Sequence, residues 1–451
     1  MRLLASIKDK GEKAKKFFYS YIYLFILSLS VYLSWLLNAP YIGLAAISIL
    51  GTLTLLFNED LTPTMALIIF AACIFATDDI SSYLIYITVL IPLIISIPLH
   101  FVIYGFKLRI GKMFFPQLAI SIAILVAGVG TIALKNYLST LFYCILLGFV
   151  ILLFYVLFCS FDKDDIKLKK DFFAKMMLFY GMLICLQLAS YYLTKKIPFS
   201  EWGKEWIHLG WAIDNNLATL LLLTAPYSFY LASQYKNKAW LFTLLGLIQY
   251  VTICFTFSRG GMLFAAVTAP FVIGFGIAKS NKKQVLLTLG IFLAAALAFY
   301  FILFDQINEK VASMLSGIGQ SDSDFLANRD KLYREAIDLF LRYPINGAGM
   351  GYAGSNYEIV VIGFYWFHST FFQIIGSMGA IGLLAYIYFY AKRYKIIVRN
   401  ARKDIFGLFS LLAMIGFELY CMVDTGTFIP VPTMMLAMML TYMNEKKTEL
   451  I

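Results

Sequence analysis

Three residues of the sequence, two arginines and a histidine, have side chains suited to binding an anion and accepting a proton. Arg259 stands in Phe257-Ser258-Arg259-Gly260-Gly261 between two apolar stretches, where a guanidinium is costly unless it meets an anion. Its planar fork of N–H donors matches the oxygens of a phosphate group, and Arg329 offers the same chemistry further along the chain. His368 is a base that titrates near neutral pH. These residue types predict a phosphate-binding site with a proton acceptor beside it.

Each of the three also has a purely structural interpretation. Arg259 could extend its long side chain to the membrane surface, and His368 could be an ordinary interfacial residue. Arg329 could belong to a solvated helix face with ion pairs such as Asp330–Arg334 at i,i+4 spacing. The glycines after Arg259 would let a headgroup approach the backbone closely. Further candidates for substrate contact are Arg334, Arg342, Tyr333, Asp214 and Asn215, although Asp214 could instead cap a helix.

The elements that must position these residues are membrane-spanning helices. Only 14% of the 451 residues are charged, against about 25% in soluble domains, and 61% are hydrophobic. This composition excludes a soluble enzyme, a disordered scaffold and a secreted disulfide-bonded module. A spanning helix needs roughly 20 apolar residues. The candidate spans are 17–37, 40–57, 62–77, 80–104, 113–134, 137–159, 172–194, 213–233, 239–257, 260–278, 284–304, 368–391, 405–423 and 427–443.

The predicted fold is therefore an all-α, polytopic transmembrane bundle of 12 to 14 spans. The lower count applies if 40–57 and 62–77 form one re-entrant pair. We expect Pro92 and Pro98 to kink the span 80–104. We also expect 17–37 to be a retained first span, because the apolar core of a signal peptide is shorter, about 7–15 residues.

Basic residues are distributed unequally between the two sets of connections. With the N-terminus inside, 27 of the 37 lysines and arginines lie on the cytoplasmic side and 10 lie outside, as the positive-inside rule requires. The net charge of +11 thus follows from topology, and no nucleic-acid partner is needed. The predicted parts are a cytoplasmic N-terminus (1–16), N-terminal spans (17–304), an extracytoplasmic loop (305–367), C-terminal spans (368–443) and a cytoplasmic tail (444–451).

The loop 305–367 is far longer than the usual connection of a few residues. Ser323-Asp324 could cap a helix that runs to Tyr343. The apolar stripe of this helix consists of Leu326, Tyr333, Ile337, Phe340 and Leu341. Pro344 would stop the helix, and a flexible turn containing Gly347, Gly349 and Gly351 would follow. We predict a folded, helix-containing lid over the outer face of the bundle.

Other features of the sequence have simpler interpretations. None of the six cysteines forms a close pair with metal-ligand spacing, so we expect neither disulfides nor a metal. The cluster of Trp202, Trp206, His208 and Trp211 is typical of an aromatic belt at the membrane interface. Glu418 is the only acid in the middle of a span, and we expect it to meet a cation or hydroxyl inside the bundle. Gly376, Gly379 and Gly382 form a small-residue face that permits close helix packing.

Several of these segments together resemble the bacterial O-antigen ligase/polymerase family. His368-Ser369, nine further residues and Gly379-Ala380-Ile381-Gly382 follow the family pattern H-[NSQ]-x9-G-x-x-G. Ser258-Arg259-Gly260-Gly261 looks like the arginine motif of the family, and Arg329 to Gly351 looks like its periplasmic-loop signature. The stretch 214–218 resembles a weaker block, so the resemblance covers roughly residues 205–390. Ser369 stands where asparagine is commoner, and Tyr333 stands where many members have tryptophan.

The resemblance implies a metal-independent, GT-C-like membrane glycosyltransferase without a cofactor, active in surface-polysaccharide biosynthesis. Such an enzyme transfers a glycan from undecaprenyl diphosphate to a glycan or lipid-linked acceptor on the outer face of the bacterial cytoplasmic membrane. The essential histidine of the family falls on His368, and its two essential arginines fall on Arg259 and Arg329. The alternative is a transporter or flippase of the same lipid-linked glycans. Transporters often contain internal repeats, and the sequence shows none.

Overall fold

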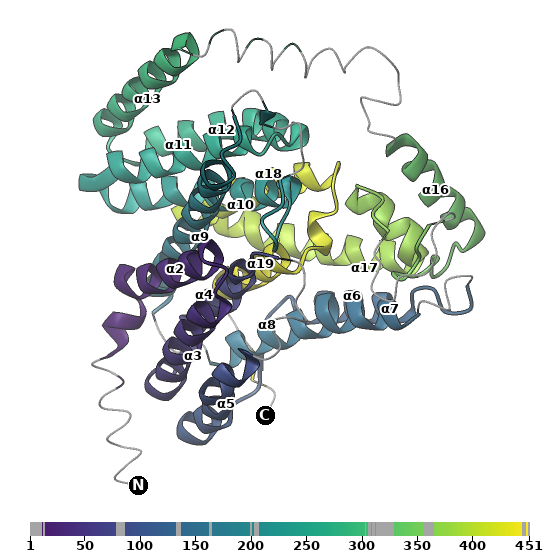
Figure 1. Ribbon diagram of the computed structural model, residues 1–451. Coiled ribbons are helices and arrows are strands. Elements are labelled where there is room, and N and C mark those ends of the chain that lie inside the picture. Colours follow the sequence, from purple (N-terminus) through teal and green to yellow (C-terminus); the bar gives the residue numbers. More distant parts are fainter. Residues whose placement is uncertain are drawn as a thin grey trace.

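The computed structural model describes residues 11, 14–77, 86–131, 137–161, 165–198, 201–202, 207–302, 304, 308, 312, 329–354, 365–443 and 448–449. This part of the chain is almost entirely helical (Figure 1). The helices pack lengthwise into a bundle, with α16 against one end of it (Figure 1). The predicted all-α fold class is confirmed.

The first half of the chain forms α2 (Tyr21–Leu36), α3 (Pro40–Phe57), α4 (Thr64–Ala71) with the 3-10 turn η1 (Ala72–Ile74), α5 (Ile91–Tyr104), α6 (Phe114–Val126), α7 (Tyr137–Tyr143), the π-helical turn η4 (Cys144–Val150), α8 (Ile151–Ser160) and α9 (Ile166–Thr194). The second half forms α10 (Asp214–Gln234), η6 (Lys236–Lys238), α11 (Ala239–Phe255), α12 (Arg259–Lys279), α13 (Lys282–Ile302), α16 (Arg329–Arg342), α17 (Thr370–Ala401), α18 (Ile405–Cys421), η7 (Gly426–Phe428) and α19 (Pro430–Met443). Two short antiparallel strands, β1 (Arg109–Ile110) and β2 (Thr448–Glu449), pair with each other.

Seven of the described helices are long and apolar enough to cross a membrane. They are α3, Tyr86–Tyr104 with α5, Thr140–Ser160 with α8, α9, Lys236–Phe255 with α11, α12 and α17. Five shorter apolar helices accompany them: α2, Thr64–Ile74, α6, α18 and α19. The chain is therefore a multi-pass membrane protein.

Several predicted spans have different ends in the structure. In the predicted span 113–134 the helix ends at Val126, because the chain turns at Gly128 and Gly130, whose φ angles are 76° and 74°. The predicted span 172–194 begins earlier, at Ile166, where the side chain of Asp165 caps α9. Pro92 lies in the first turn of α5, so only Pro98 stands inside that helix.

The connections gather at two opposite ends of the bundle, as the predicted up-and-down alternation requires. At the end that contains His368, Trp35 donates to the carbonyl of Leu209 at 2.8 Å, and the segment before α12 packs on the start of α10. At the other end, Lys170 pairs with Asp404 at 2.6 Å and Asn400 donates to the carbonyl of Met443. We call these the His368 end and the Lys170 end. In the described part of the chain, residues of the predicted outer connections lie at the His368 end and residues of the predicted inner connections lie at the Lys170 end.

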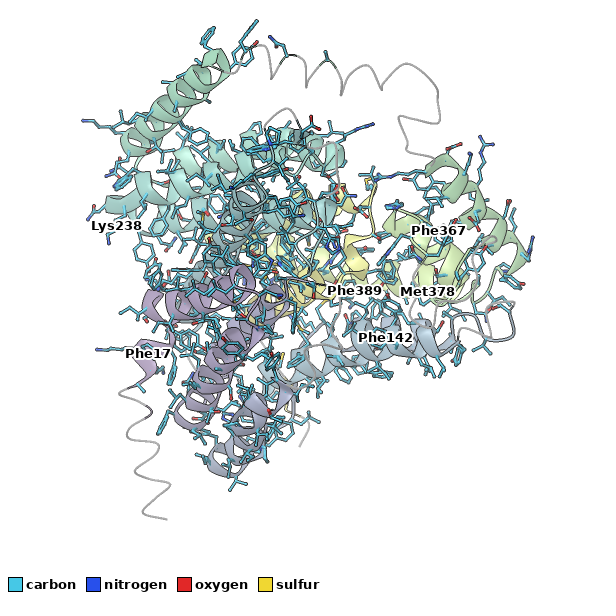
Figure 2. All side chains as sticks on the ribbon, viewed as in Figure 1. Phe17, Phe142, Lys238, Phe367, Met378 and Phe389 are labelled. Atoms are coloured by element: carbon cyan, nitrogen blue, oxygen red, sulfur yellow. The ribbon has the colours of Figure 1, made fainter. Side chains whose placement is uncertain are left out.

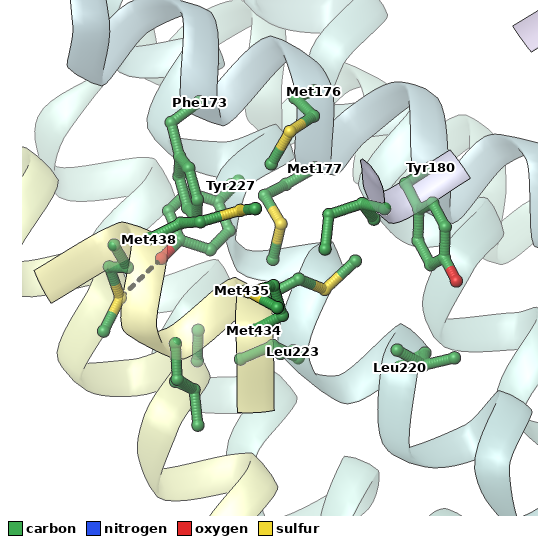
Figure 3. Packing of buried hydrophobic residues seen from close by; sticks show 14 of the residues in the cluster. Phe173, Met176, Met177, Tyr180, Leu220, Leu223, Tyr227, Met434, Met435 and Met438 are labelled. Atoms are coloured by element: carbon green, nitrogen blue, oxygen red, sulfur yellow. Dashed lines mark hydrogen bonds between the residues drawn. The ribbon is translucent and has the colours of Figure 1, made fainter. Parts of the chain in front are cut away.

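Buried hydrophobic side chains pack closely where α9, α10 and α19 meet (Figure 3). Methionines of α9 and α19 fill the space between aromatic rings, a use to which their flexible side chains are suited. The residues drawn there include Phe173, Met176, Met177, Leu223, Tyr227, Met434, Met435 and Met438. The hydroxyl of Tyr227 donates to Ser410 Oγ at 3.1 Å, which satisfies its polar group inside the core.

Two buried ion pairs tie helices together. Lys169 of α9 lies 2.8 Å from Asp60, and the two side chains are 1% and 2% exposed. Arg393 of α17 pairs with Glu418 of α18, so Glu418 meets a cation inside the bundle as predicted. Removing one partner of such a pair would leave an uncompensated buried charge, at a cost of roughly 3–5 kcal/mol.

Helix α17 is interrupted at Gly379, whose φ of 60° and ψ of −152° strain any other residue. The turn after α16 bonds to the backbone groups on both sides of this break. The N–H groups of Ala348 and Gly349 donate to carbonyls before the break at 2.9 and 2.8 Å. Two carbonyls at 344–345 accept from N–H groups after the break at 2.8 and 3.0 Å. The turn predicted as flexible is therefore docked into α17, and Gly379 is a break rather than part of a packing face.

We expect Gly379→Ala to destabilise the protein by about 1–3 kcal/mol, because of its backbone angles. In addition, the new Cβ would lie 2.6 Å from the amide nitrogen of Gly347. Thermal unfolding of the detergent-purified protein measures this loss of stability. Gly274→Ala in α12 is the matched control, since a Cβ there meets nothing within 4 Å, and its melting temperature should be unchanged or slightly raised. Equal melting temperatures for Gly379→Ala and the wild type would contradict the expectation.

Candidate functional site

Arg259 is the first residue of α12, and the residues before it fix where the helix begins. Ser258 caps the helix, because its Oγ accepts the N–H of Gly261 at 3.2 Å. The same hydroxyl donates to Oδ1 of Asn215 at 2.8 Å, which joins α12 to the start of α10. Phe257 adopts a left-handed φ of 55°, uncommon outside glycine. Arg259 itself is exposed at the His368 end of the bundle.

The two glycines after Arg259 are packed against neighbouring helices, which corrects the expectation that they leave room for a headgroup. A Cβ on Gly260 would meet the ring of Tyr420 at 2.9 Å, and one on Gly261 would meet the Cβ of Ala218 at 2.6 Å. The small residues therefore let α12 approach α18 and α10 closely.

The carboxylate of Asp424, in the turn between α18 and α19, links the arginine segment to His368. The hydroxyl of Tyr420 lies 2.9 Å from Ser258 Oγ and donates to Asp424 Oδ2 at 3.3 Å. The other carboxylate oxygen, Oδ1, accepts the N–H of Thr425 at 2.7 Å and lies 3.8 Å from His368 Nδ1. Asp424 is buried. A chain of three side chains thus connects the start of α12 with the imidazole.

His368 is held in a strained conformation from several sides. Its φ is 48°, in the left-handed region that non-glycine residues seldom adopt. Its carbonyl accepts the hydroxyl of Tyr333 at 3.2 Å, and the N–H of Thr370 donates to the carbonyl of Asp424 at 3.1 Å. Nδ1 is buried on the side of Asp424, while the side chain is 38% exposed. The accessible edge of the ring is therefore the one that carries Nε2.

Helix α16 brings the second arginine to the same turn. Nη1 of Arg329 donates to the carbonyl of Val423 at 2.5 Å, next to Asp424. One turn along, the ring of Tyr333 stacks on Phe372 of α17, with centroids 4.2 Å apart and planes at 13°. Phe367 lies between these two helices (Figure 2). Arg329, Tyr333 and His368 thus lie together where α16 meets α17.

The other arginines of α16 are exposed on the remainder of its surface. Arg342 lies near Tyr352. Among the described residues, Arg334 forms no hydrogen bond or ion pair with the residues of the site. The face of α16 that packs on α17 holds Ala336 and Leu339, whereas the predicted stripe residues Ile337 and Leu341 are 42% and 71% exposed. The stripe was predicted in part: Tyr333 packs on α17, but Ile337 and Leu341 do not, because the apolar side of this helix is wider than the face that meets α17. Leu326 and the predicted cap at 323–324 lie outside the described residues.

Asp214 and Asn215, at the start of α10, both border the site. Oδ1 of Asp214 accepts the N–H of Asn215 at 2.7 Å, while Ile213 occupies the capping position. The charges of Asp214 and Asp424 are close enough to interact.

Two tryptophans of the predicted aromatic belt nearby also pack within the fold. Trp211 donates to the buried Gln187 at 3.0 Å, and Trp202 stacks on Tyr192 with centroids 4.0 Å apart. His208 is exposed, and Trp206 lies outside the described residues.

The surroundings of Asp424 favour its charged form. Burial raises the pKa of this carboxyl, but the His368 imidazole, the N–H of Thr425 and the Arg329 charge outweigh burial. The pKa therefore lies below the ordinary value of 3.8. Burial raises the pKa of the Tyr333 phenol, and the nearby Arg329 opposes this shift. The site thus presents the buried carboxylate of Asp424, an accessible imidazole edge and the guanidinium of Arg329, and Arg259 is exposed at the same end of the bundle.

In the part of the chain that the structure describes, no group of three or more histidines, cysteines or acids could hold a metal ion. All six cysteines are free thiols.

The segment that contains the two arginines and the histidine matches a known protein family. The family model described as O-antigen ligase matches residues 219–387, a segment that includes Arg259, Arg329 and His368. Over these residues the chain is similar to the O-antigen ligase family. The resemblance noted in the sequence is thereby confirmed, and it supports a membrane enzyme of surface-polysaccharide biosynthesis. No curated protein matches the chain.

Two residues that organise the site were missed by the sequence analysis. Asp424 and Tyr420 lie C-terminal to the matched segment, in and before a short connection, where an acid ordinarily indicates only a turn. The available signal was position, because Asp424 begins a connection on the same predicted side as His368. Asn215, likewise outside the matched segment, was found from its neighbours in sequence.

We expect the contribution of Asp424 to stability to depend on pH. Because its folded pKa is below the ordinary one, the carboxylate stabilises the native state above the unfolded pKa. That stabilisation is lost as the pH falls through the folded value. The melting-temperature difference between the wild type and Asp424→Asn should be constant above about pH 5 and shrink below about pH 4.

Thermal unfolding in detergent between about pH 3 and 7 measures this difference. Asp338→Asn, which changes an exposed acid of α16, is the control and should show no such trend. A wild-type to Asp424→Asn difference that stays constant to the lowest pH would contradict the assignment.

Proposed function

We propose that this protein transfers a glycan from undecaprenyl diphosphate to an acceptor hydroxyl at the outer face of the bacterial cytoplasmic membrane. The acceptor is a glycan or a lipid-linked molecule. The observation that carries the proposal is the convergence of Arg329, His368 and the Ser258-Arg259 segment around the Asp424 turn. The excess of basic residues at the Lys170 end supports an outward-facing His368 end, with both termini inside.

The arginines would bind the diphosphate of the donor. As the glycosidic C–O bond breaks, negative charge develops on the departing diphosphate, and two guanidinium groups would neutralise it. Arg259 is exposed and begins a helix, so the helix N-terminus adds to the positive potential there. In this proposal the arginines supply the positive charge that a metal supplies in other transferases.

His368 would act as the general base. Its accessible Nε2 would take the proton of the acceptor hydroxyl while that oxygen attacks the anomeric carbon. The buried Asp424 carboxylate faces Nδ1, and it would keep the proton on that nitrogen and stabilise the imidazolium that forms. Asp424 is thus a positioning residue. Attack from the face opposite the diphosphate would invert the anomeric carbon.

Helix α16 would help to exclude water from the reacting groups. It docks on α17 through Tyr333 and Phe372 and through the turn inserted at Gly379. Both carboxylate oxygens of its Glu335 accept tyrosine hydroxyls, from Tyr352 at 2.6 Å and Tyr365 at 2.7 Å. These contacts fix the lid to α17 and to the segment before it, which contains His368. Exclusion of water would protect the donor from hydrolysis.

We expect His368→Ala to lose about 10²–10⁴-fold in transfer rate, the range for a general base, while donor binding is retained. The assay follows a labelled glycan from undecaprenyl diphosphate to product by purified protein in EDTA. His208→Ala, which changes an exposed histidine of the same end, should transfer at the wild-type rate.

Two results would contradict the proposal. One is equal transfer by His368→Ala and His208→Ala. The other is movement of labelled lipid across a liposome bilayer at the same rate by wild type and His368→Ala, with no product from any acceptor. That result would favour a transporter.

A further inference from the structure

The side chain of Gln373, in the first turn of α17, reaches back to the segment that precedes His368. Its Oε1 accepts the N–H of Phe367 at 3.0 Å, and its Nε2 donates to the carbonyl of Tyr365 at 3.3 Å. Nε2 also donates to Ser377 Oγ at 3.0 Å, one turn further along the helix. Gln373 is 1% exposed. One buried amide thus joins the start of α17 to the backbone on the N-terminal side of His368.

The partners of this amide determine its orientation. A backbone N–H can only donate and a carbonyl can only accept, so Oε1 must face Phe367 and Nε2 must face Tyr365. Phe367 is itself 1% exposed, so its N–H needs an acceptor within the protein. Glutamine supplies both the acceptor and the donors at one position. A methionine of similar length would make none of these bonds.

His368 lies between two stretches of backbone that are held in place. On its N-terminal side, Gln373 bonds to Phe367. On its C-terminal side, the N–H of Thr370 donates to the carbonyl of Asp424 at 3.1 Å. The φ of 48° at His368 persists only where the surroundings impose it. Release of the N-terminal side would let this angle return to negative values and would turn the imidazole away from Asp424.

We propose that Gln373 is a positioning residue for the transfer reaction, which keeps His368 in its left-handed conformation with Nδ1 toward Asp424. The proposal rests on the transferase function proposed above. Gln373 is buried, so it acts through His368 and not on the substrate. Its loss should therefore lower kcat and leave KM for the donor unchanged.

Gln373→Met tests this role in the transfer assay with purified full-length protein. We expect kcat to fall about 10²-fold, the order of loss for a misplaced catalytic group. In the His368→Ala background the same change should cause little further loss. Gln373→Glu should recover part of the rate, because a buried carboxyl that stays protonated can accept from Phe367 and donate to Tyr365.

Gln249→Met is the matched control for the loss of a buried amide. Gln249 is 0% exposed, and it accepts from Thr224 at 2.9 Å and donates to Ser228 at 3.1 Å, away from the site. This variant should unfold at a lower temperature than the wild type and keep the wild-type kcat. Elution volume and melting temperature establish that each variant is folded. Gln373→Ala, which lacks the same bonds, takes the place of Gln373→Met if that variant does not fold.

A second measurement does not depend on transfer. NMR of the ring nitrogens, in protein labelled at histidine, reports which nitrogen carries the proton, and the signals absent from His368→Ala identify His368. We expect the Nδ1–H form in wild type and Gln249→Met, and a mixture of both forms in Gln373→Met. If these spectra are observed but the wild type transfers no glycan, the transferase function fails and the effect of Gln373 on His368 stands.

Two results would overturn the role of Gln373. One is a His368 spectrum in Gln373→Met that equals the wild-type spectrum. The other is an equal kcat for Gln373→Met and Gln249→Met, which would make the amide a purely structural group.

Discussion

A carboxylate buried away from water must be paired or hydrogen-bonded to stay ionised, and Asp424 meets this condition with groups from separate parts of the chain. Tyr420 donates to one oxygen, while the other faces Thr425 and the imidazole of His368. The backbone beside it accepts from Arg329 of α16. The position of the turn between α18 and α19 therefore determines where the histidine and one arginine lie, and Ser258 extends the same network to the start of α12.

The break in α17 provides the second constraint. An unbroken helix would pair its own backbone groups at Gly379 and leave the turn after α16 without partners. The break instead lets residues 344–349 bond to α17 and carry the end of α16 with them. Tyr333 and Phe372 then align the two helices, so that Arg329 reaches the turn at Val423. Backbone strain at Phe257 and His368 is consistent with a site whose geometry is imposed by its surroundings.

The sequence predicted those features that depend on composition and local pattern. Apolar stretches predicted the helices, and the alternation of the spans predicted which connections share an end of the bundle. The spacing from His368 to Gly379 indicated the family, but the pattern did not reveal that Gly379 breaks the helix. The buried face of α16 and the role of Asp424 could not be predicted, because both depend on contacts between segments far apart in the chain. Glu418 was predicted in part. Its position inside a span indicated a cation or hydroxyl as its partner, but only the packing of the helices shows that the partner is Arg393.

A double-mutant cycle on His368 and Asp424 tests the central claim most directly, namely that Asp424 acts through His368. The transfer rate kcat is measured at saturating donor for wild type, His368→Ala, Asp424→Asn and the double variant. We expect Asp424→Asn to lower kcat in the wild type and to have little further effect once His368 is alanine. The two losses in kcat should therefore not be additive. Fully additive losses would show that Asp424 contributes independently of the imidazole and would contradict the account.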